Sequence, residues 1–300
     1  MREKREERRW KKRTFREAVR CELREHRSSF LVFSVLRLLV VVCLVRQAFL
    51  HNYESVFLAA LTLALLYVPS WVQVRLRVEI PVGLEIAILC FIYAAEIMGE
   101  IQAFYLHLPF WDTMLHTVNG FLCAAVGFSL VWVLNRKEEG TFVLSPFYLA
   151  FMAFCFSMTV GVLWEFFECT MDRVFLLDMQ KDTVLHRIST VLLDPAKSNR
   201  PVVVRDIADV IVVHSDGSQQ VLGLGGYVDV GLLDTMKDLF VNFLGAVTFS
   251  CIGYHYAKRR SRSGPAALFI PSEKERGRDY LSIARQEERE EDEAGTDRRV

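Results

Sequence analysis

The sequence predicts an all-α polytopic membrane protein with six transmembrane helices and a small extracytoplasmic insertion made of a helix and a β-hairpin. The apolar residues are gathered in six blocks of about 20 residues, the length that crosses the hydrocarbon core of a bilayer. Charged residues are gathered at the two ends of the chain and in the segments between the blocks. This distribution carries the prediction, because an average hydrophobic content of 52% is close to that of soluble proteins.

The first 29 residues are rich in arginine and lysine and are predicted to form a basic cytoplasmic leader, 1–29. The block that follows, Phe30–Leu50, is longer than the apolar core of a secretory signal, and no Ala-x-Ala cleavage pattern comes after it. We therefore expect it to be retained as the first span. The second block is Val56–Val72, and Pro69 is tolerated there because it lies near the end of the block.

Four further blocks are predicted as spans three to six: Ile80–Met98, Asp112–Leu134, Ser145–Phe167 and Asp238–Tyr256. Two of them begin with helix-start signals. Pro81 lies in the first turn of the third span, and Ser145 before Pro146 supplies a capping residue for the fifth. The predicted organisation follows: spans one to five within 30–168, an extracytoplasmic loop at 169–237, span six within 238–257, and a charged cytoplasmic tail, mostly disordered, at 258–300.

The distribution of lysine and arginine between the spans predicts the orientation of the chain. Basic residues follow each even-numbered span: Arg75 and Arg77, Arg136 and Lys137, and Lys258, Arg259 and Arg260. The short segments 51–55 and 99–111 contain neither lysine nor arginine. Because basic loops stay on the cytoplasmic side, we predict a multi-pass protein of the plasma membrane with both termini cytoplasmic.

The extracytoplasmic loop and the tail carry local patterns of their own. Residues 179–193 have apolar side chains at helical spacing, which predicts an amphipathic helix on the membrane surface. Two β-branched runs, 201–213 and 219–224, flank the turn signal Ser215-Asp216-Gly217-Ser218 and predict a β-hairpin. In the tail, residues 269–271 are a candidate docking segment within otherwise polar chain.

Two properties of the whole chain exclude other classes of protein. The 36 basic residues balance the 36 acidic ones, so the net charge predicts no nucleic-acid partner. The seven cysteines are scattered through the chain without Cys-x-x-Cys spacing, so they predict neither a disulfide framework nor a cysteine metal site.

Ionisable residues gather near the predicted outer ends of the spans, although the orientation rests on lysine and arginine alone. Six of them are candidate site residues with catalytic potential: Asp112, His116, Glu165, Glu168, Asp234 and Asp238. Within each span these residues are three or four positions apart and therefore share a helix face. If spans four to six pack together, the six side chains form one polar pocket, which is costly at the edge of a bilayer and therefore indicates a role.

Three interpretations of this pocket remain open. Asp112, His116, Glu165 and Asp238 are candidate ligands of a divalent cation, because carboxylates and an imidazole suit Mg²⁺, Mn²⁺, Ca²⁺ or Zn²⁺. Alternatively, the carboxylates and His116 act as acids and bases on a lipid-linked substrate. In the third interpretation Lys237 and nearby arginines neutralise the acids, and the network only holds the helices together.

Two further charges lie deeper in the predicted spans. Arg37 in the first span and Glu85 in the third are at similar depth from the cytoplasmic side. An unpaired charge is expensive there, so we predict an ion pair between them.

Three motifs carry a resemblance to a known family: Phe110–Phe121, Gly161–Glu168 and Gly231–Gly245. Together they resemble the bacterial YjdF-like inner-membrane family, which is distantly similar to VanZ-like proteins. The resemblance covers spans three to six and implies a bacterial plasma-membrane location, but it implies no reaction. VanZ-like relatives are linked to resistance against glycopeptides directed at the cell envelope, which implies envelope lipids or antimicrobials as partners.

The first functional hypothesis is an outer-leaflet site that binds or acts on an envelope lipid or an antimicrobial, by metal-assisted or acid–base chemistry. The alternatives are a transporter or cation-binding permease, and a structural membrane protein whose polar network only locks helices. Transport is disfavoured because the sequence shows no inverted repeat and no broken span. The sequence predicts membrane lipid as a partner and leaves the reaction, the metal and the oligomeric state open.

Overall fold

The computed structural model describes residues 18–19, 21, 27–76, 78–137, 144–259, 268–270 and 272–273. Most of the predicted leader and most of the predicted tail therefore lie outside the described residues. Six helical segments in the described part are long and apolar enough to cross a membrane, which confirms the predicted fold class: Ser28–Phe49, Tyr53–Arg75, Val82–Ile101, Trp111–Trp132, Pro146–Phe175 and Leu232–Arg259. Each of these overlaps its predicted block, and the last two extend well beyond their blocks into the predicted loop.

The chain divides into two compact units, one of residues 1–159 with 242–300 and the other of residues 160–241. The boundaries fall inside two uninterrupted helices, α8 (Pro146–Phe175) and α9 (Leu232–Arg259). Each of these helices therefore belongs to both units, and the units are described in turn below.

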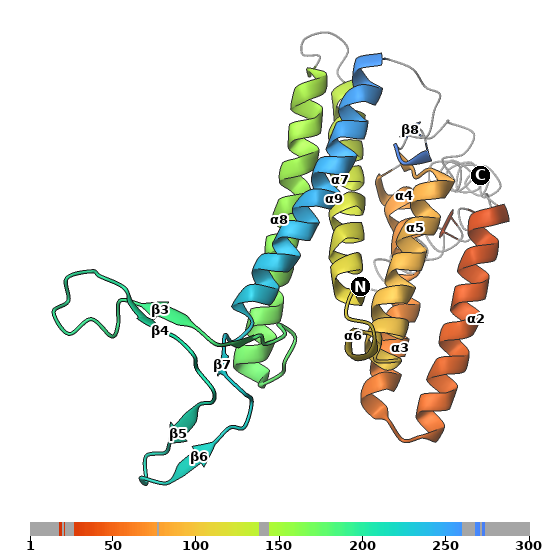
Figure 1. Ribbon diagram of the computed structural model, residues 1–300. Coiled ribbons are helices and arrows are strands. Elements are labelled where there is room, and N and C mark those ends of the chain that lie inside the picture. The colour runs from red at the N-terminus through yellow and green to blue at the C-terminus, as the bar shows by residue number, and fades with distance from the viewer. Residues whose placement is uncertain are drawn as a thin grey trace, which may run out of the picture. The chain divides into compact units, whose positions relative to one another are not determined.

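The first unit holds the helices of the first four spans, which are coloured red to yellow in Figure 1. Their bounds are α2 (Arg27–Phe49), α3 (Tyr53–Leu65), α4 (Val68–Leu76), α5 (Val82–Tyr93), η1 (Ala94–Ile101), α6 (Phe104–His107) and α7 (Trp111–Lys137). α2 packs on α3 and α5, and α5 packs on α7. One apolar cluster, which includes Val40, Ala59 and Leu89, joins α2, α3 and α5. A second cluster around Phe128 and Phe249 joins α5, α7 and the adjoining parts of α8 and α9.

Spans two and three are not single α-helices, which corrects the expectation of unbroken spans. α3 ends at Leu65 and α4 begins at Val68, next to Pro69. Proline lacks the N–H that would continue the hydrogen-bond ladder from the preceding turn. The third span changes at Ala94 from α5 into the π-helix η1. π-Helical segments are rare and frequently lie at functional sites. The unbroken spans on which the prediction against transport rested in part are therefore not observed.

The contact between α7 and the C-terminal part of α9 is unusually close. A Cβ atom on Gly120 would overlap the backbone of Asn242, and a Cβ atom on Gly245 would overlap the carbonyl oxygen of Thr117. Small residues allow such approach between membrane helices. Further along the two helices Trp132 contacts Tyr256, with ring centroids 5.8 Å apart. The order of these contacts shows that α7 and α9 run in the same direction.

The predicted ion pair between Arg37 and Glu85 is not among the ion pairs found in the described residues. The guanidinium carbon of Arg37 lies 5.4 Å from the ring centroid of Tyr67, in a cation–π contact. Glu85 accepts a hydrogen bond from Nε2 of Gln73 at 3.2 Å, and Oε1 of Gln73 accepts one from the backbone N–H of Ile80 at 2.9 Å. Arg37 therefore interacts with Tyr67, and Glu85 interacts with Gln73. The prediction had considered only pairs of opposite charges.

A short segment of the tail packs against the helices of the first unit. This confirms the predicted docking segment for residues 269 and 270. Ile270 is buried in the second apolar cluster, and the ring of Phe269 lies 5.4 Å from that of Phe121. Strand β8 (Ser272–Glu273) pairs antiparallel with β1 (Val78–Glu79), where Val78 faces Glu273. The segment is therefore held both by apolar burial and by backbone hydrogen bonds.

We expect Ile270→Asp to release this segment, because the substitution places a carboxylate in an apolar cluster. The variant pair Val78→Cys and Glu273→Cys measures the docking directly, since residues facing each other in an antiparallel pair lie within disulfide reach. Mild oxidation is expected to form this disulfide readily in the parent chain and about tenfold less when Ile270→Asp is added. Equal yields in the two backgrounds would contradict the docked arrangement.

The second unit contains the end of α8, three antiparallel strand pairs and the start of α9. The pairs are β2 (Val184–Leu185) with β7 (Tyr227–Val228), β3 (Ile188–Thr190) with β4 (Val202–Val204), and β5 (Ile211–Val213) with β6 (Gln219–Val221). The last pair confirms the predicted hairpin. In its turn Gly217 has a φ of +84°, and Asp216 accepts a hydrogen bond from the N–H of Ser218 at 2.9 Å.

The predicted amphipathic helix at 179–193 is wrong, because this segment is extended and forms β2 and β3. The apolar positions fitted a helical period, but Val184, Ile188 and Val191 are β-branched and favour strands. The partner strands β7 and β4 lie far along the chain and complete the backbone hydrogen bonds of the segment. Strand pairing at long range therefore overrides the local pattern.

Candidate functional site

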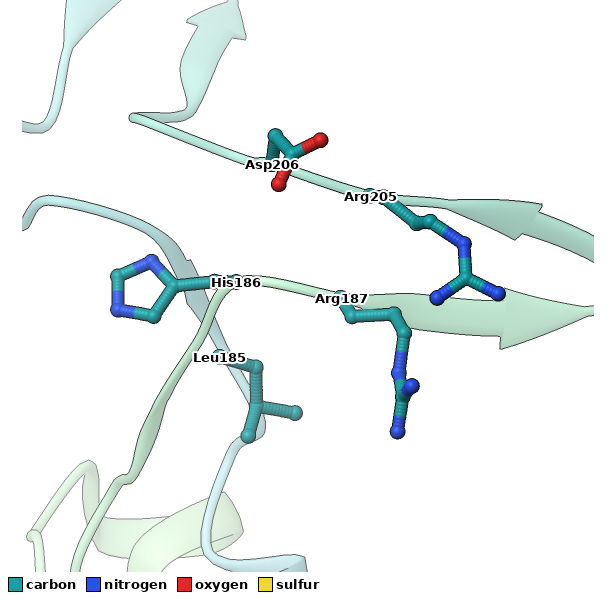
Figure 2. A pocket seen from close by; sticks show the side chains of 5 residues that line it. All are labelled: Leu185, His186, Arg187, Arg205 and Asp206. Atoms are coloured by element: carbon teal, nitrogen blue, oxygen red, sulfur yellow. The ribbon is translucent and has the colours of Figure 1, made fainter.

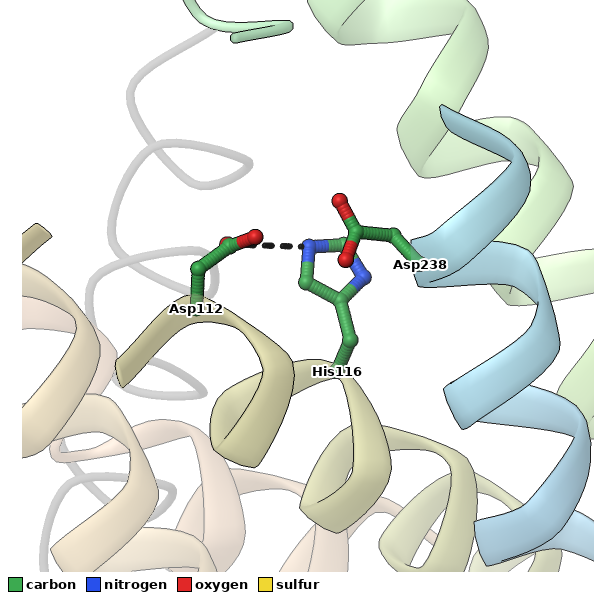
Figure 3. Close-up of side chains that lie close together, drawn as sticks. All are labelled: Asp112, His116 and Asp238. Carbon is green, nitrogen blue, oxygen red and sulfur yellow. Dashed lines mark ion pairs between the residues drawn. The ribbon is translucent and has the colours of Figure 1, made fainter. Parts of the chain in front are cut away.

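The first two predicted site residues form a pair at the start of α7. Asp112 lies in the first turn of the helix and His116 in the next turn, on the same face. Nε2 of His116 is 3.4 Å from Oδ1 of Asp112, and Figure 3 shows this ion pair as a dashed line. The His116 side chain is buried, whereas that of Asp112 is 26% exposed. Asp112 is thus the member of the pair that water or a headgroup can reach.

The position of Asp238 follows from the packing of α9 on α7. The amide of Asn119 donates to Oδ1 of Asn242 at 3.4 Å, and Ser157 donates to the carbonyl oxygen of Gly120 at 2.8 Å. Because α9 is uninterrupted, Asp238 lies one turn before Asn242 on the same face. His116 lies one turn before Asn119 on α7, which runs in the same direction. His116 and Asp238 therefore each lie one turn before the residues that make this contact.

One potential ligand atom from each of Asp112, His116 and Asp238 lies within 4.8 Å of the other two, as Figure 3 illustrates. Among the described residues, these three form the group of histidine, cysteine and acidic side chains that lie close enough together to hold a metal ion. Asp238 is almost completely buried, at 1% exposure. The arrangement offers two carboxylate oxygens and one imidazole nitrogen. Glu165, the fourth predicted ligand, is not a member of this group.

The remaining predicted site residues have partners inside the second unit. Glu168 accepts a hydrogen bond from the indole N–H of Trp164 at 2.8 Å. Asp234 pairs with Nζ of Lys237 at 2.6 Å and accepts the backbone N–H of Lys181 at 2.8 Å. Glu168 and Asp234 are thus each engaged by neighbouring groups of the second unit.

A polar strap, defined as Met179–Thr183, connects the two helices of the second unit. Asp172 on α8 accepts the N–H groups of Met179 and Gln180 at 2.6 and 2.9 Å. The side-chain amide of Gln180 then bridges Oε2 of Glu165 at 3.5 Å and Oγ1 of Thr235 at 2.5 Å. Gln180 and Thr235 were not predicted, because they are far apart in sequence and no local pattern joins them.

Asp229 fixes the other end of the strap and the start of α9. Its carboxylate accepts the N–H of Thr183 at 2.7 Å and that of Leu233 at 2.9 Å. Burial by itself raises the pKa of Asp229, but backbone N–H groups that hydrogen-bond to the carboxylate, those of Thr183, Leu233, Gly231 and Asp229, together outweigh it and hold the pKa below its usual value.

The second unit also has an open polar cleft of about 410 Å³ beside the β3–β4 pair, shown in Figure 2. It is lined by Leu185, His186, Arg187, Arg205 and Asp206. Nδ1 of His186 lies 3.1 Å from the carbonyl oxygen of Ile207, so the ring is engaged by the backbone. This contact gives His186 a structural role at the surface.

Comparison with known proteins identifies the family of this chain. The family described as "Predicted membrane protein (DUF2238)" matches residues 31–196, more than half of the chain. The chain belongs to the DUF2238 family. DUF2238 includes YjdF-like proteins, which confirms the resemblance found in the sequence. The DUF2238 match includes Asp112 and His116 and ends before α9, on which Asp238 lies.

An uncharacterized protein of Thermotoga maritima is 28% identical to this chain over 96 residues, which is 32% of this chain and 47% of that protein. The match thus spans about half of the length of this relative. No solved structure matches the chain.

Proposed function

We propose that Asp112, His116 and Asp238 bind a divalent cation and that this DUF2238 protein uses the ion to act on a membrane lipid. The convergence of two carboxylates and one imidazole within 4.8 Å is the observation that supports the proposal. A mixed oxygen and nitrogen ligand set suits Zn²⁺ or Mn²⁺. Three protein ligands leave coordination positions for water and substrate, as catalytic sites do and closed structural sites do not.

A lipid substrate is favoured by where the candidate ligands lie. Asp112 begins the helix whose following residues cross the bilayer, so the site is at the boundary between headgroups and acyl chains. With both termini cytoplasmic, as the basic loops indicate, this boundary belongs to the outer leaflet. The ion would activate water against an ester or phosphate group of a lipid headgroup.

A purely structural role of the same residues is the competing interpretation, because the neighbouring Asn119–Asn242 hydrogen bond holds α7 and α9 together. The test is metal binding by the purified protein in lipid nanodiscs, with Zn²⁺ and Mn²⁺ supplied separately. We expect one ion per chain in the parent protein. His116→Ala and Asp238→Asn are each expected to weaken binding by about 100-fold while the unfolding temperature changes little, because each removes a ligand.

Asp178→Asn is the matched control, since this carboxylate is exposed and lies outside the cluster. It is expected to bind metal as the parent does. A parent protein that binds no metal, or ligand variants that bind metal as tightly as the parent, would refute the site. The reaction is tested separately by mass spectrometry of bacterial lipids incubated with parent and His116→Ala protein. A product that requires both the ion and His116 supports action on a lipid, and its absence from the metal-loaded parent refutes that step.

A further inference from the structure

An apolar groove opens within the first unit, between the first half of α8 and the last half of α9. Its volume is about 410 Å³. Phe147 and Phe151 stack along the α8 side with ring centroids 6.2 Å apart. Phe154 meets Phe243 of α9 edge to face at 5.5 Å and closes one end of the groove. A bilayer-spanning protein meets acyl chains at such a surface, and they match its aromatic and aliphatic lining.

One polar side chain interrupts this lining. Ser250 lines the groove, is only 8% exposed, and its hydroxyl has no hydrogen-bond partner in the described part of the chain. Its neighbour on α9, Thr248, donates to the carbonyl oxygen of Leu244 at 2.7 Å, as hydroxyls in membrane helices commonly do. A buried hydroxyl without a partner is unfavourable. Ser250 is therefore available to an acceptor that enters the groove, such as the ester carbonyl of a lipid.

The other end of the groove is basic. Tyr254 and His255 line it, and α9 ends with Lys258 and Arg259. Nζ of Lys258 lies 5.7 Å from the ring centroid of Tyr254, so the Lys258 side chain reaches back toward the groove. Tyr254 is four residues beyond Ser250, a rise of about 6 Å along a helix. Lys258 itself is about two turns beyond Ser250, and its Nζ reaches back to the ring of Tyr254.

We propose that this groove binds one acyl chain of an anionic phospholipid, whose ester is held by Ser250 and whose phosphate is held by Lys258 and His255. Three features in sequence along α9 match the three parts of such a lipid: an apolar channel, a donor for the ester and a cation for the phosphate. Basic residues at the end of a membrane helix attract anionic headgroups. This lipid site is separate from the proposed cation site and does not depend on it.

The test uses the full chain in nanodiscs that contain phosphatidylglycerol or phosphatidylcholine with a photoreactive group in one acyl chain. With phosphatidylglycerol, cross-links are expected on 147–154 and 243–255. With phosphatidylcholine they are expected to be about tenfold fewer, because the phosphate of that lipid is neutralised by its own choline. Lys258→Gln is expected to remove most of this preference, whereas the exposed Lys197→Gln leaves it unchanged. Equal labelling by the two lipids in the parent protein would refute the headgroup contact.

Ala150→Phe fills the groove and is expected to reduce cross-linking by about tenfold; undiminished labelling at the same residues would refute the acyl-chain site.

Cys251 provides a measurement on the parent chain that does not depend on a variant folding, since it lines the groove and is exposed. Phosphatidylglycerol is expected to slow maleimide labelling of Cys251 at least fivefold relative to phosphatidylcholine, and equal rates would overturn the proposal. Protection of Cys251 by dimer formation without lipid would equally overturn it, because a second copy would then occupy the groove.

Discussion

Gly245→Val is expected to prevent the protein from folding stably in the membrane. A Cβ atom at this position would overlap the carbonyl oxygen of Thr117 and lie 2.8 Å from the backbone nitrogen of Phe121. Both obstacles belong to the backbone of α7, so no side chain can rotate away. The helices would have to separate, and we expect a loss of more than about 3 kcal/mol in the free energy of unfolding.

Gly120→Val should have a similar effect from the other helix, because its Cβ atom would meet the backbone of Asn242. The measurement is the yield and unfolding temperature of monodisperse protein in detergent. Thr248→Val is the control, since this exposed residue lies on α9 only three positions from Gly245. If Gly245→Val and Thr248→Val unfold at the same temperature, the close contact of α7 and α9 is wrong.

Gln73→Leu is expected to destabilise the other half of the first unit by about 2–4 kcal/mol, because two buried groups each lose a hydrogen bond. Gln73 is 1% exposed and serves at once as donor to Glu85 and as acceptor for the N–H of Ile80. Leucine has a similar size, so the change in packing is small. Thermal unfolding in detergent measures the effect.

The double variant Gln73→Leu with Glu85→Leu separates the hydrogen bond from the general effect of the substitution. Removing both partners of a buried hydrogen bond is less harmful than removing one. The double variant is therefore expected to lose less free energy of unfolding than the sum of the losses in the two single variants. Strict additivity would show that the Gln73–Glu85 contact contributes nothing.

The features that could be predicted from the sequence are those that depend on neighbouring residues. A block such as Val82–Ile101 spans the bilayer because of its own composition, and the Asp112–His116 pair forms because four residues make one helical turn. The β5–β6 hairpin likewise depends on a local turn at Gly217. These elements can be predicted without the rest of the fold, because the contacts that form them are local.

The features that could not be predicted depend on partners far along the chain. Residues 188–190 form a strand because residues 202–204 are available to pair with them. Asp238 joins the group of Asp112 and His116 from a helix far along the chain. Arg37 finds the face of Tyr67, an interaction that a search for opposite charges does not consider. In each case the deciding contact is made in three dimensions.

The distribution of charge along α9 couples this helix to the membrane voltage. Asp234 lies in its first turn, and Lys258 and Arg259 lie in its last. The cytoplasm is electrically negative, and each elementary charge moved across the bilayer changes the free energy by about 2.3 kcal/mol per 100 mV. If the basic end of α9 faces the cytoplasm, as the basic loops predict, the resting potential helps to hold this helix in the inserted direction.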